Sequence, residues 1–308
     1  MTATREVQRT TKPVRRLGDR VFSGSARGAG ILLLVILAGV AAFLVVEAVP
    51  ALHAPASQLP GHQGITAYIW PLLFGTLVAA VIALLIGAPL AVAIALFIAF
   101  YAPRRLAQAL GYLVDLLAAI PSVVFGFWGI SWLAPRMVPF YQWLEHHLGF
   151  LPLFTGPASV TGRTMFTAGL VLAVMILPII SAIAREVFRQ APALHREAAL
   201  ALGATRWEMI RMAVLPYGRS GIIGGAMLGL GRALGETIAV LLILSTVSNF
   251  SPSLFSGGQT FASKIAGSSA EFGANPGPYI AAGLVLFVLT FVVNAAARMI
   301  VSRRKEFS

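Results

Sequence analysis

The sequence contains no cysteine and few charged residues. Without cysteine, disulfide frameworks and thiolate metal sites are excluded. Charged residues make up 11% of the 308 positions, whereas roughly a quarter is usual in a soluble domain. Apolar residues make up 58%. The composition therefore excludes an ordinary soluble enzyme and indicates a polytopic membrane protein.

A nucleotide-binding loop is also missing. The pattern G-x-x-x-x-G-K-[ST] does not occur, and none of the lysines Lys12, Lys264 and Lys305 ends a glycine-rich stretch. The chain therefore has no P-loop with which to bind ATP. The adjacent His146 and His147 are only a weak metal candidate, so no metal or other cofactor is expected here. If the protein works with ATP, a separate subunit holds the ATP and magnesium.

Apolar segments are long enough to cross a hydrocarbon core of roughly 30 Å. We predict an all-α fold with a basic N-terminal tail at 1–27, a first transmembrane helix, a five-helix core at 70–302 and a short end at 303–308. The apolar stretch of the first helix is too long for a signal peptide, so we interpret it as a retained span. The six spans are predicted at 28–50, 70–101, 106–134, 164–189, 218–247 and 278–302.

Lysine and arginine are distributed unequally along the chain. When the loops are assigned alternately to two sides, 19 of these residues fall on the side of both termini and 3 on the other. Positive residues concentrate in cytoplasmic segments, so both termini are expected in the cytoplasm. The net charge of +12 is then explained by topology and not by nucleic-acid binding.

Proline and glycine interrupt the predicted spans, as in AAIPSVVFGFWG and GIIGGAMLGLG. Membrane helices tolerate such residues when neighbouring helices satisfy the backbone, and small residues let helices approach closely. Helix packing is the more common explanation for such residues. The alternative, a functional one, is that they form a hinge or line a cavity. The second explanation gains weight for Pro121 and Ser122, because Asp115 lies in the same predicted span.

One predicted span carries two opposite charges, Arg232 and Glu236 in GLGRALGETIAVLLIL. A lone arginine at the bilayer centre costs about 2.5–3.5 kcal/mol, and residues four apart on a helix share a face. A structural interpretation is that the two charges, alone or with Asp115, neutralise each other. The functional interpretation is an anion gate, because a guanidinium presents a planar fork of donors. Glu236 would then pair with Arg232 when no anion is bound, and Thr237 would offer a hydroxyl.

The longest cytoplasmic segment, at 190–217, is not apolar enough to span. We expect a helix up to residue 202, a sharp turn at Gly203, and a second short helix. Thr205 and Glu208 have the spacing of a capping box at the start of that second helix. The segment is thus predicted to form a hairpin whose apolar side meets a partner protein or rests on lipid.

Two motifs resemble a known family. Glu197-Ala198-Ala199, Gly203 and Leu215-Pro216 have the spacing of the EAA loop of ABC importer permeases, with Ala213 where that pattern has isoleucine. The stretches VDLLAAIPSVVFGFWG and LGRALGETIAV resemble PstC-type permeases of phosphate importers. The resemblance covers nearly the whole chain and implies a type I ABC importer permease fold. It also implies that the hairpin is the coupling helix that docks on an ATPase subunit.

The same resemblance implies a function, partners and a place for Arg232 and Glu236 in the phosphate path. We expect a permease subunit of an ATP-driven inorganic phosphate importer in the bacterial inner membrane, itself not an enzyme. Its expected partners are a PstA-type permease, a PstB-type ATPase dimer and a PstS-type phosphate-binding protein outside. Sulfate or molybdate are competing substrates, and a proton-coupled secondary transporter with a relay of Asp115, Arg232 and Glu236 is the alternative class. The expected substrate path consists of Arg232, Glu236, Thr237, Asp115, Pro121 and Ser122.

Overall fold

The computed structural model describes residues 17–56, 59, 64–245, 250–268 and 276–303, and every regular element in these ranges is helical. The predicted all-α fold is therefore confirmed. The expected basic tail up to residue 16 and the C-terminal residues 304–308 lie outside the described residues. The longer helices are α1 (Leu17–Leu52), α2 (Ile65–Leu96), α6 (Met165–Arg189), α9 (Leu215–Gly235) and α12 (Gly277–Arg303).

Shorter helices and π-helical segments join these long ones. The π segments η3 (Phe97–Tyr101), η4 (Gly129–Leu133) and η6 (Ile210–Val214) directly follow α2, α4 and α8, and a 3₁₀ turn, η5, covers Pro152–Phe154. The short α-helices are α3 (Arg104–Ala119), α4 (Ser122–Trp128), α5 (Ala134–Leu148), α7 (Ala193–Ala201), α8 (Arg206–Met209), α10 (Ile238–Ile243) and α11 (Phe261–Gly267).

The chain divides into two compact units, residues 1–46 and 47–308. The first unit contains most of α1, which begins at Leu17 and not at the predicted residue 28. Its segment from Val21 onward is long and apolar enough to cross a membrane. The predicted spans 70–101, 164–189 and 278–302 are confirmed in the second unit, although α2 begins earlier, at Ile65.

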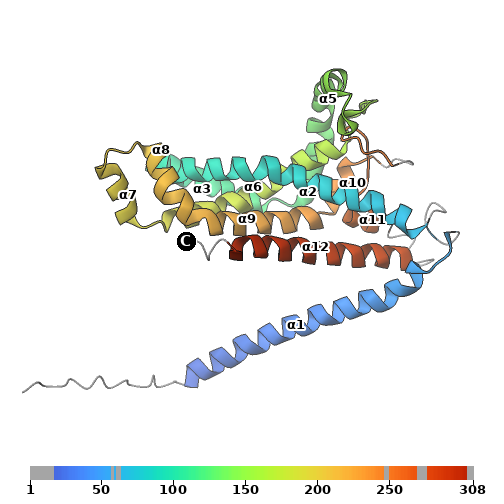
Figure 1. Cartoon of the computed structure of the whole chain (residues 1–308), viewed down its shortest axis with the longest axis horizontal. Helices are drawn as coiled ribbons and strands as arrows, with labels where there is room; N and C mark the ends of the chain where they lie inside the picture. The colour runs from blue at the N-terminus through green and yellow to red at the C-terminus, as the bar shows by residue number, and fades with distance from the viewer. Residues whose placement is uncertain (1–16, 57–58, 60–63, 246–249, 269–275, 304–308) are drawn as a thin grey trace, which may run out of the picture. The chain divides into compact units, whose positions relative to one another are not determined.

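Three long helices form the core of the second unit. α2 lies along α6, and α9 packs on α6 (Figure 1). The α9 surface toward α6 consists of glycines spaced three or four apart, so the two backbones come close. A Cβ atom at Gly221 would lie 2.3 Å from Val187 Cγ2, and one at Gly229 would lie 2.9 Å from Ile180 Cδ1. The packing interpretation of the glycine-rich stretch is thus confirmed.

The predicted span 106–134 is wrong as a single helix. α3 ends at Ala119, and Ile120 and Pro121 are extended before α4 begins. Proline has no backbone N–H, and its ring disfavours a helical conformation at the preceding residue. Helical structure then continues without a gap from Ser122 to Leu148, where we predicted a loop at 135–163. Pro135 stands in the first turn of α5, a position that a helix tolerates.

The predicted span 218–247 is also interrupted. α9 ends at Gly235, Glu236 is extended (φ −70°, ψ 126°), and α10 begins at Ile238. By length and composition, five helices in the described part of the chain could cross a membrane, against six predicted, and the interrupted α9 is not among them. Within the second unit, α7 and α8 lie at one end, and α10 and α11 lie toward the other (Figure 1).

Candidate functional site

The break after α9 separates the two charges that were expected to pair. Arg232 lies in the last turn of α9, whereas Glu236 lies beyond its end. The spacing of four residues therefore no longer places both on one helix face. Glu236 Oε1 instead accepts a hydrogen bond from the backbone N–H of Ala239 at 3.4 Å. Glu236 thus caps α10, and no ion pair joins it to Arg232 among the described residues.

Arg232 is half-buried and lacks a partner for one donor. Its Nε is buried without a hydrogen-bond acceptor within the described ranges. A buried donor left unsatisfied costs about 1–3 kcal/mol, and more when the group is charged. The guanidinium can therefore gain from any ligand that brings acceptor oxygens. The neighbouring Thr237 hydroxyl donates to the carbonyl of Gly235 at 3.1 Å.

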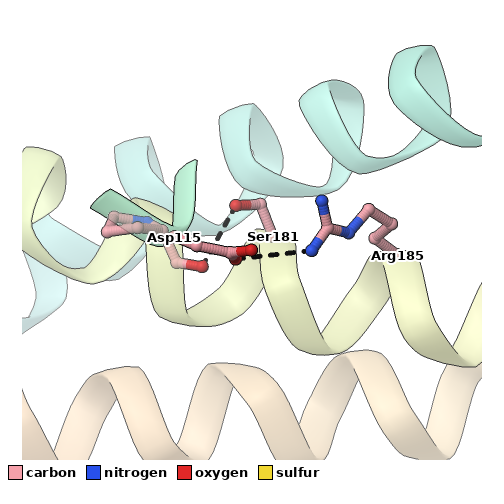
Figure 2. Close-up of polar contacts among 4 residues, drawn as sticks. Asp115, Ser181 and Arg185 are labelled. Atoms are coloured by element: carbon pink, nitrogen blue, oxygen red, sulfur yellow. Dashed lines mark hydrogen bonds and ion pairs between the residues drawn. The ribbon is translucent and has the colours of Figure 1, made fainter. Parts of the chain in front are cut away.

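Asp115 pairs with an arginine that the sequence did not suggest. Its Oδ1 lies 3.4 Å from Nη2 of Arg185, which joins α3 to α6 (Figure 2). The Asp115 side chain is 55% exposed and that of Arg185 is 16% exposed. A pair this exposed contributes at most about 1 kcal/mol. The expectation that Asp115 helps to neutralise Arg232 is wrong, because its carboxylate faces a different helix.

The two helix breaks lie at the same level of the bundle. A Cβ atom at Gly126 would lie 3.0 Å from Ala239 Cα, and one at Gly129 would lie 3.0 Å from Ile243 Cδ1. α4 and α10 therefore run parallel in close contact. When the same pairing of residues is followed toward the N-terminal ends of both helices, the start of α4 lies beside the start of α10. The structure thus brings Pro121 and Ser122 to the level of Glu236 and Thr237.

Arg163 is a residue of this region that sequence reasoning missed. Its Nε donates to the carbonyl of Ile243 at 3.2 Å, and its Nη2 donates to those of Leu242 and Leu244 at 3.1 Å. These carbonyls lie at the end of α10, where a helix lacks internal donors. Two features of the sequence could have pointed to Arg163. It directly precedes Thr164, which caps α6, and it lies in a loop assigned to the side of the membrane with few positive residues. Arg163 holds the end of α10 in place.

The predicted helix–turn–helix geometry of the hairpin is confirmed. α7 and α8 are joined through Gly203, whose φ of 85° is in the left-handed region that favours glycine. Thr205 Oγ1 accepts from Glu208 N at 3.3 Å, and Glu208 Oε2 accepts from Thr205 N at 2.7 Å. The hydrogen bonds from Thr205 lower the pKa of the Glu208 carboxyl. The predicted capping box therefore forms.

One side of this hairpin is anchored and the other is open. Ala199 packs on a buried cluster that includes Phe188 of α6 and Ile210 of η6. Leu194 and Leu202 are 77% and 89% exposed. Glu197, Ala198 and Gly203 are also exposed, whereas Leu215 is half-buried at the start of α9, followed by the exposed Pro216. The open side of the hairpin thus presents apolar side chains together with charged ones, including Glu197.

No metal centre is formed within the described residues. No group of three or more histidine, aspartate or glutamate side chains lies together in that part of the chain. His146 and His147 lie in the last turn of α5 and not in a loop.

Comparison with known proteins identifies the relatives of this architecture. Residues 87–306 match the family described as binding-protein-dependent transport system inner membrane component. A relative from Mycobacterium tuberculosis, "Phosphate transport system permease protein PstC 2", is 52% identical over 303 residues, covering 94% of this chain and 93% of that protein. A Mycobacterium leprae relative, "Phosphate transport system permease protein PstC", is 48% identical and covers 93% of this chain and 94% of that protein.

A solved structure supports the fold. A chain of a bacterial ABC transporter involved in the import of the acidic polysaccharide alginate matches with a TM-score of 0.54 and 19% identity. The match covers 92% of this chain and 99% of that one. At this identity the likeness extends to the fold, which is that of an ABC importer permease.

Proposed function

The chain belongs to the binding-protein-dependent transport system inner membrane components and, among them, to the PstC-type phosphate permeases, and we propose that Arg232 is the anion-binding residue of its phosphate path. The chain is thus a multi-pass inner-membrane permease subunit of an ABC transporter and not an ATPase. The path is formed together with a second permease subunit.

One observation carries the assignment of Arg232. Its guanidinium stands at the end of α9 with a buried Nε that has no acceptor in the described part of the chain. Phosphate near neutral pH carries one to two negative charges and several acceptor oxygens, which suits a planar fork of donors. An ordinary structural arginine resembles Arg163, whose donors are satisfied by three carbonyls. Arg232 differs from it in this respect.

Glu236 has a different role from the one first expected. Its carboxylate caps α10, so it holds the helix break open beside Arg232 and does not neutralise the arginine. A carboxylate close to the path also prevents the site from becoming so positive that it retains the anion. Pro121, Ser122 and Thr237 lie at the same level of the helix bundle as Glu236, because α4 and α10 pack in parallel. Asp115 lies outside this group, on α3 beside Arg185.

The exposed hairpin formed by α7 and α8 is the docking element for the ATPase subunit. Membership of the ABC importer permeases implies an ATPase and further subunits, and the exposed Leu194, Leu202 and Glu197 supply the contact surface. We assign the partners as a PstA-type permease, a PstB-type ATPase dimer that binds ATP and magnesium, and a PstS-type phosphate-binding protein. The hairpin and both termini lie in the cytoplasm, in agreement with the unequal distribution of arginine and lysine.

The proposal is tested by reconstituting the complex in liposomes with its binding protein and measuring ATP-driven uptake of labelled phosphate, sulfate and molybdate. We expect uptake of phosphate that requires ATP and the ATPase subunit. The chain alone, under an imposed proton gradient, should move no anion. Phosphate uptake by the chain alone would show a secondary transporter, and preferred uptake of sulfate or molybdate would contradict the substrate.

A further inference from the structure

A polar cavity lies between α10 and α11. It has a volume of about 240 Å³ and is lined by Leu241 and Leu244 of α10, Gly258, Gln259, Ser263, Lys264, Gly267 and Ser268. At about 30 Å³ per water molecule, this space holds a small oxyanion together with part of its hydration shell. Leu241 lies in α10, five residues after Glu236 in the chain.

Among the described residues that line this cavity, Lys264 is the one that carries a charge. The residue is half-buried, and no carboxylate within the described ranges lies within 4 Å of its ammonium group. Its ammonium offers three rotatable donors and no acceptor. The wall residue Ser268 is only 5% exposed, and its hydroxyl can both donate and accept a hydrogen bond. The two side chains therefore present one positive charge and one hydroxyl to the same space.

The walls of the cavity are held firmly to the core. The backbone N–H of Phe261 donates to Thr76 Oγ1 of α2 at 3.0 Å, and a Cβ atom at Gly75 would lie 2.2 Å from the carbonyl oxygen of Gln259. Thr260 and Ser263 form a capping box at the start of α11. A cavity with rigid walls keeps its polar groups in position before a ligand arrives, which reduces the ordering cost of binding.

From these observations we propose that this cavity, named here the Lys264 pocket, binds a small tetrahedral oxyanion before it reaches Arg232. The proposal rests on the proposed function, because the anion it expects is inorganic phosphate on the way to the helix break. With the hairpin in the cytoplasm, the Lys264 pocket lies toward the outer end of the path, since α11 and the hairpin lie at opposite ends of the second unit (Figure 1). Phosphate released from the binding protein then meets Lys264 and Ser268 before it reaches Arg232.

Direct binding is measured by lysine protection. The chain has only three lysines, so Lys12→Arg and Lys305→Arg leave Lys264 as the single lysine of this subunit. The assembled complex, in a detergent free of phospholipid, is treated with a membrane-impermeant amine-reactive ester, and modification of Lys264 is followed by mass spectrometry. Inorganic phosphate should slow the modification, whereas chloride at equal ionic strength should not. Ser268→Ala should raise the phosphate concentration that gives half protection by about tenfold, the value of a hydrogen bond to a charged ligand.

The source of the phosphate group is distinguished in a parallel arm. A short-chain phosphatidylglycerol replaces inorganic phosphate in the same assay. Protection by the lipid and not by inorganic phosphate would overturn the proposal and identify a lipid-headgroup site. Absence of protection by either would also overturn it.

Transport gives an independent readout in liposomes that contain the complete importer. Lys264→Gln should lower the phosphate moved per ATP hydrolysed, and Lys264→Arg should restore most of it. Arg136→Gln is the matched control, because Arg136 is another cation outside the cavity, stacked over Trp132 at 4.4 Å. Wild-type coupling in Lys264→Gln would refute the Lys264 pocket while leaving the proposed function intact. A wild-type importer that moves no phosphate would instead refute the proposed function.

Discussion

The close contact between α6 and α9 leads to a paired prediction about two glycines of one helix. A Cβ atom at Gly221 would lie 2.3 Å from Val187 Cγ2 and 2.8 Å from its Cγ1, whereas nothing lies within 4 Å of a Cβ atom at Gly224. Carbon atoms pack best at about 3.5–4.0 Å, so Gly221→Ala requires the helices to separate by roughly 1 Å. Val187 is β-branched and cannot rotate away easily.

The expected cost follows from overpacking. Inserting one methyl group into a tight contact destabilises by about 1–3 kcal/mol, which lowers the ratio of folded to unfolded protein by roughly 5- to 150-fold. Gly224→Ala adds the same methyl group on an open face and should be neutral or slightly stabilising, because alanine favours a helix over glycine by about 1 kcal/mol.

The assay is the thermal stability of the purified complex, followed by its elution as an intact particle after heating. Gly221→Ala should lose the intact particle at a lower temperature than wild type, and Gly224→Ala should not. Equal behaviour of the two variants would refute the close contact between α6 and α9.

Three further predictions concern the hairpin and α10. Gly203→Val should abolish uptake at normal membrane levels of the chain, since a left-handed φ costs a β-branched residue about 1–2 kcal/mol or more. Gly203→Asn should retain uptake. Equal activity of the two variants would contradict the left-handed turn at this position. Because the folded-state pKa of Glu208 is lowered, its capping contribution is present above the unfolded pKa of about 4.3 and is lost as pH falls through the lower folded value. Hydrogen exchange of the hairpin amides in the complex should therefore accelerate at acid pH relative to intrinsic rates, and Glu208→Gln should remove that dependence. Arg163→Met leaves three carbonyls of α10 without their donor and should cost about 1–3 kcal/mol of complex stability, measured against Arg136→Gln, which should behave as wild type.

The sequence predicted those features that depend on local chemistry. Hydropathy and length were sufficient for the helices at 164–189 and 278–302, and the capping spacing of Thr205 and Glu208 was sufficient for the start of α8. The left-handed turn at Gly203 followed from the same reasoning. These features require only neighbours in the chain.

The helix breaks could not be derived in the same way. Pro121 was visible as an irregularity, but hydropathy remains high on both sides of it and gave one long span. At Glu236 there is no proline, and the only sign of the break is a carboxylate that accepts from the backbone N–H of Ala239 in the first turn of α10. The pairing of Asp115 with Arg185 and the role of Arg163 depend on contacts between residues 70 and about 80 positions apart. Local spacing contains no information on such contacts.

The central claim is that Arg232 binds the transported phosphate and does not merely neutralise Glu236. Its most direct test is ATP-driven phosphate uptake by reconstituted complexes carrying Arg232→Met, Glu236→Met and both substitutions, with complex yield measured in parallel. We expect Arg232→Met and the double variant to lose uptake while the complex still assembles. Arg232→Lys should recover little, because it keeps the charge and loses the planar fork. Phosphate uptake restored in the double variant would contradict the claim, because it would show that the two charges serve only to neutralise each other.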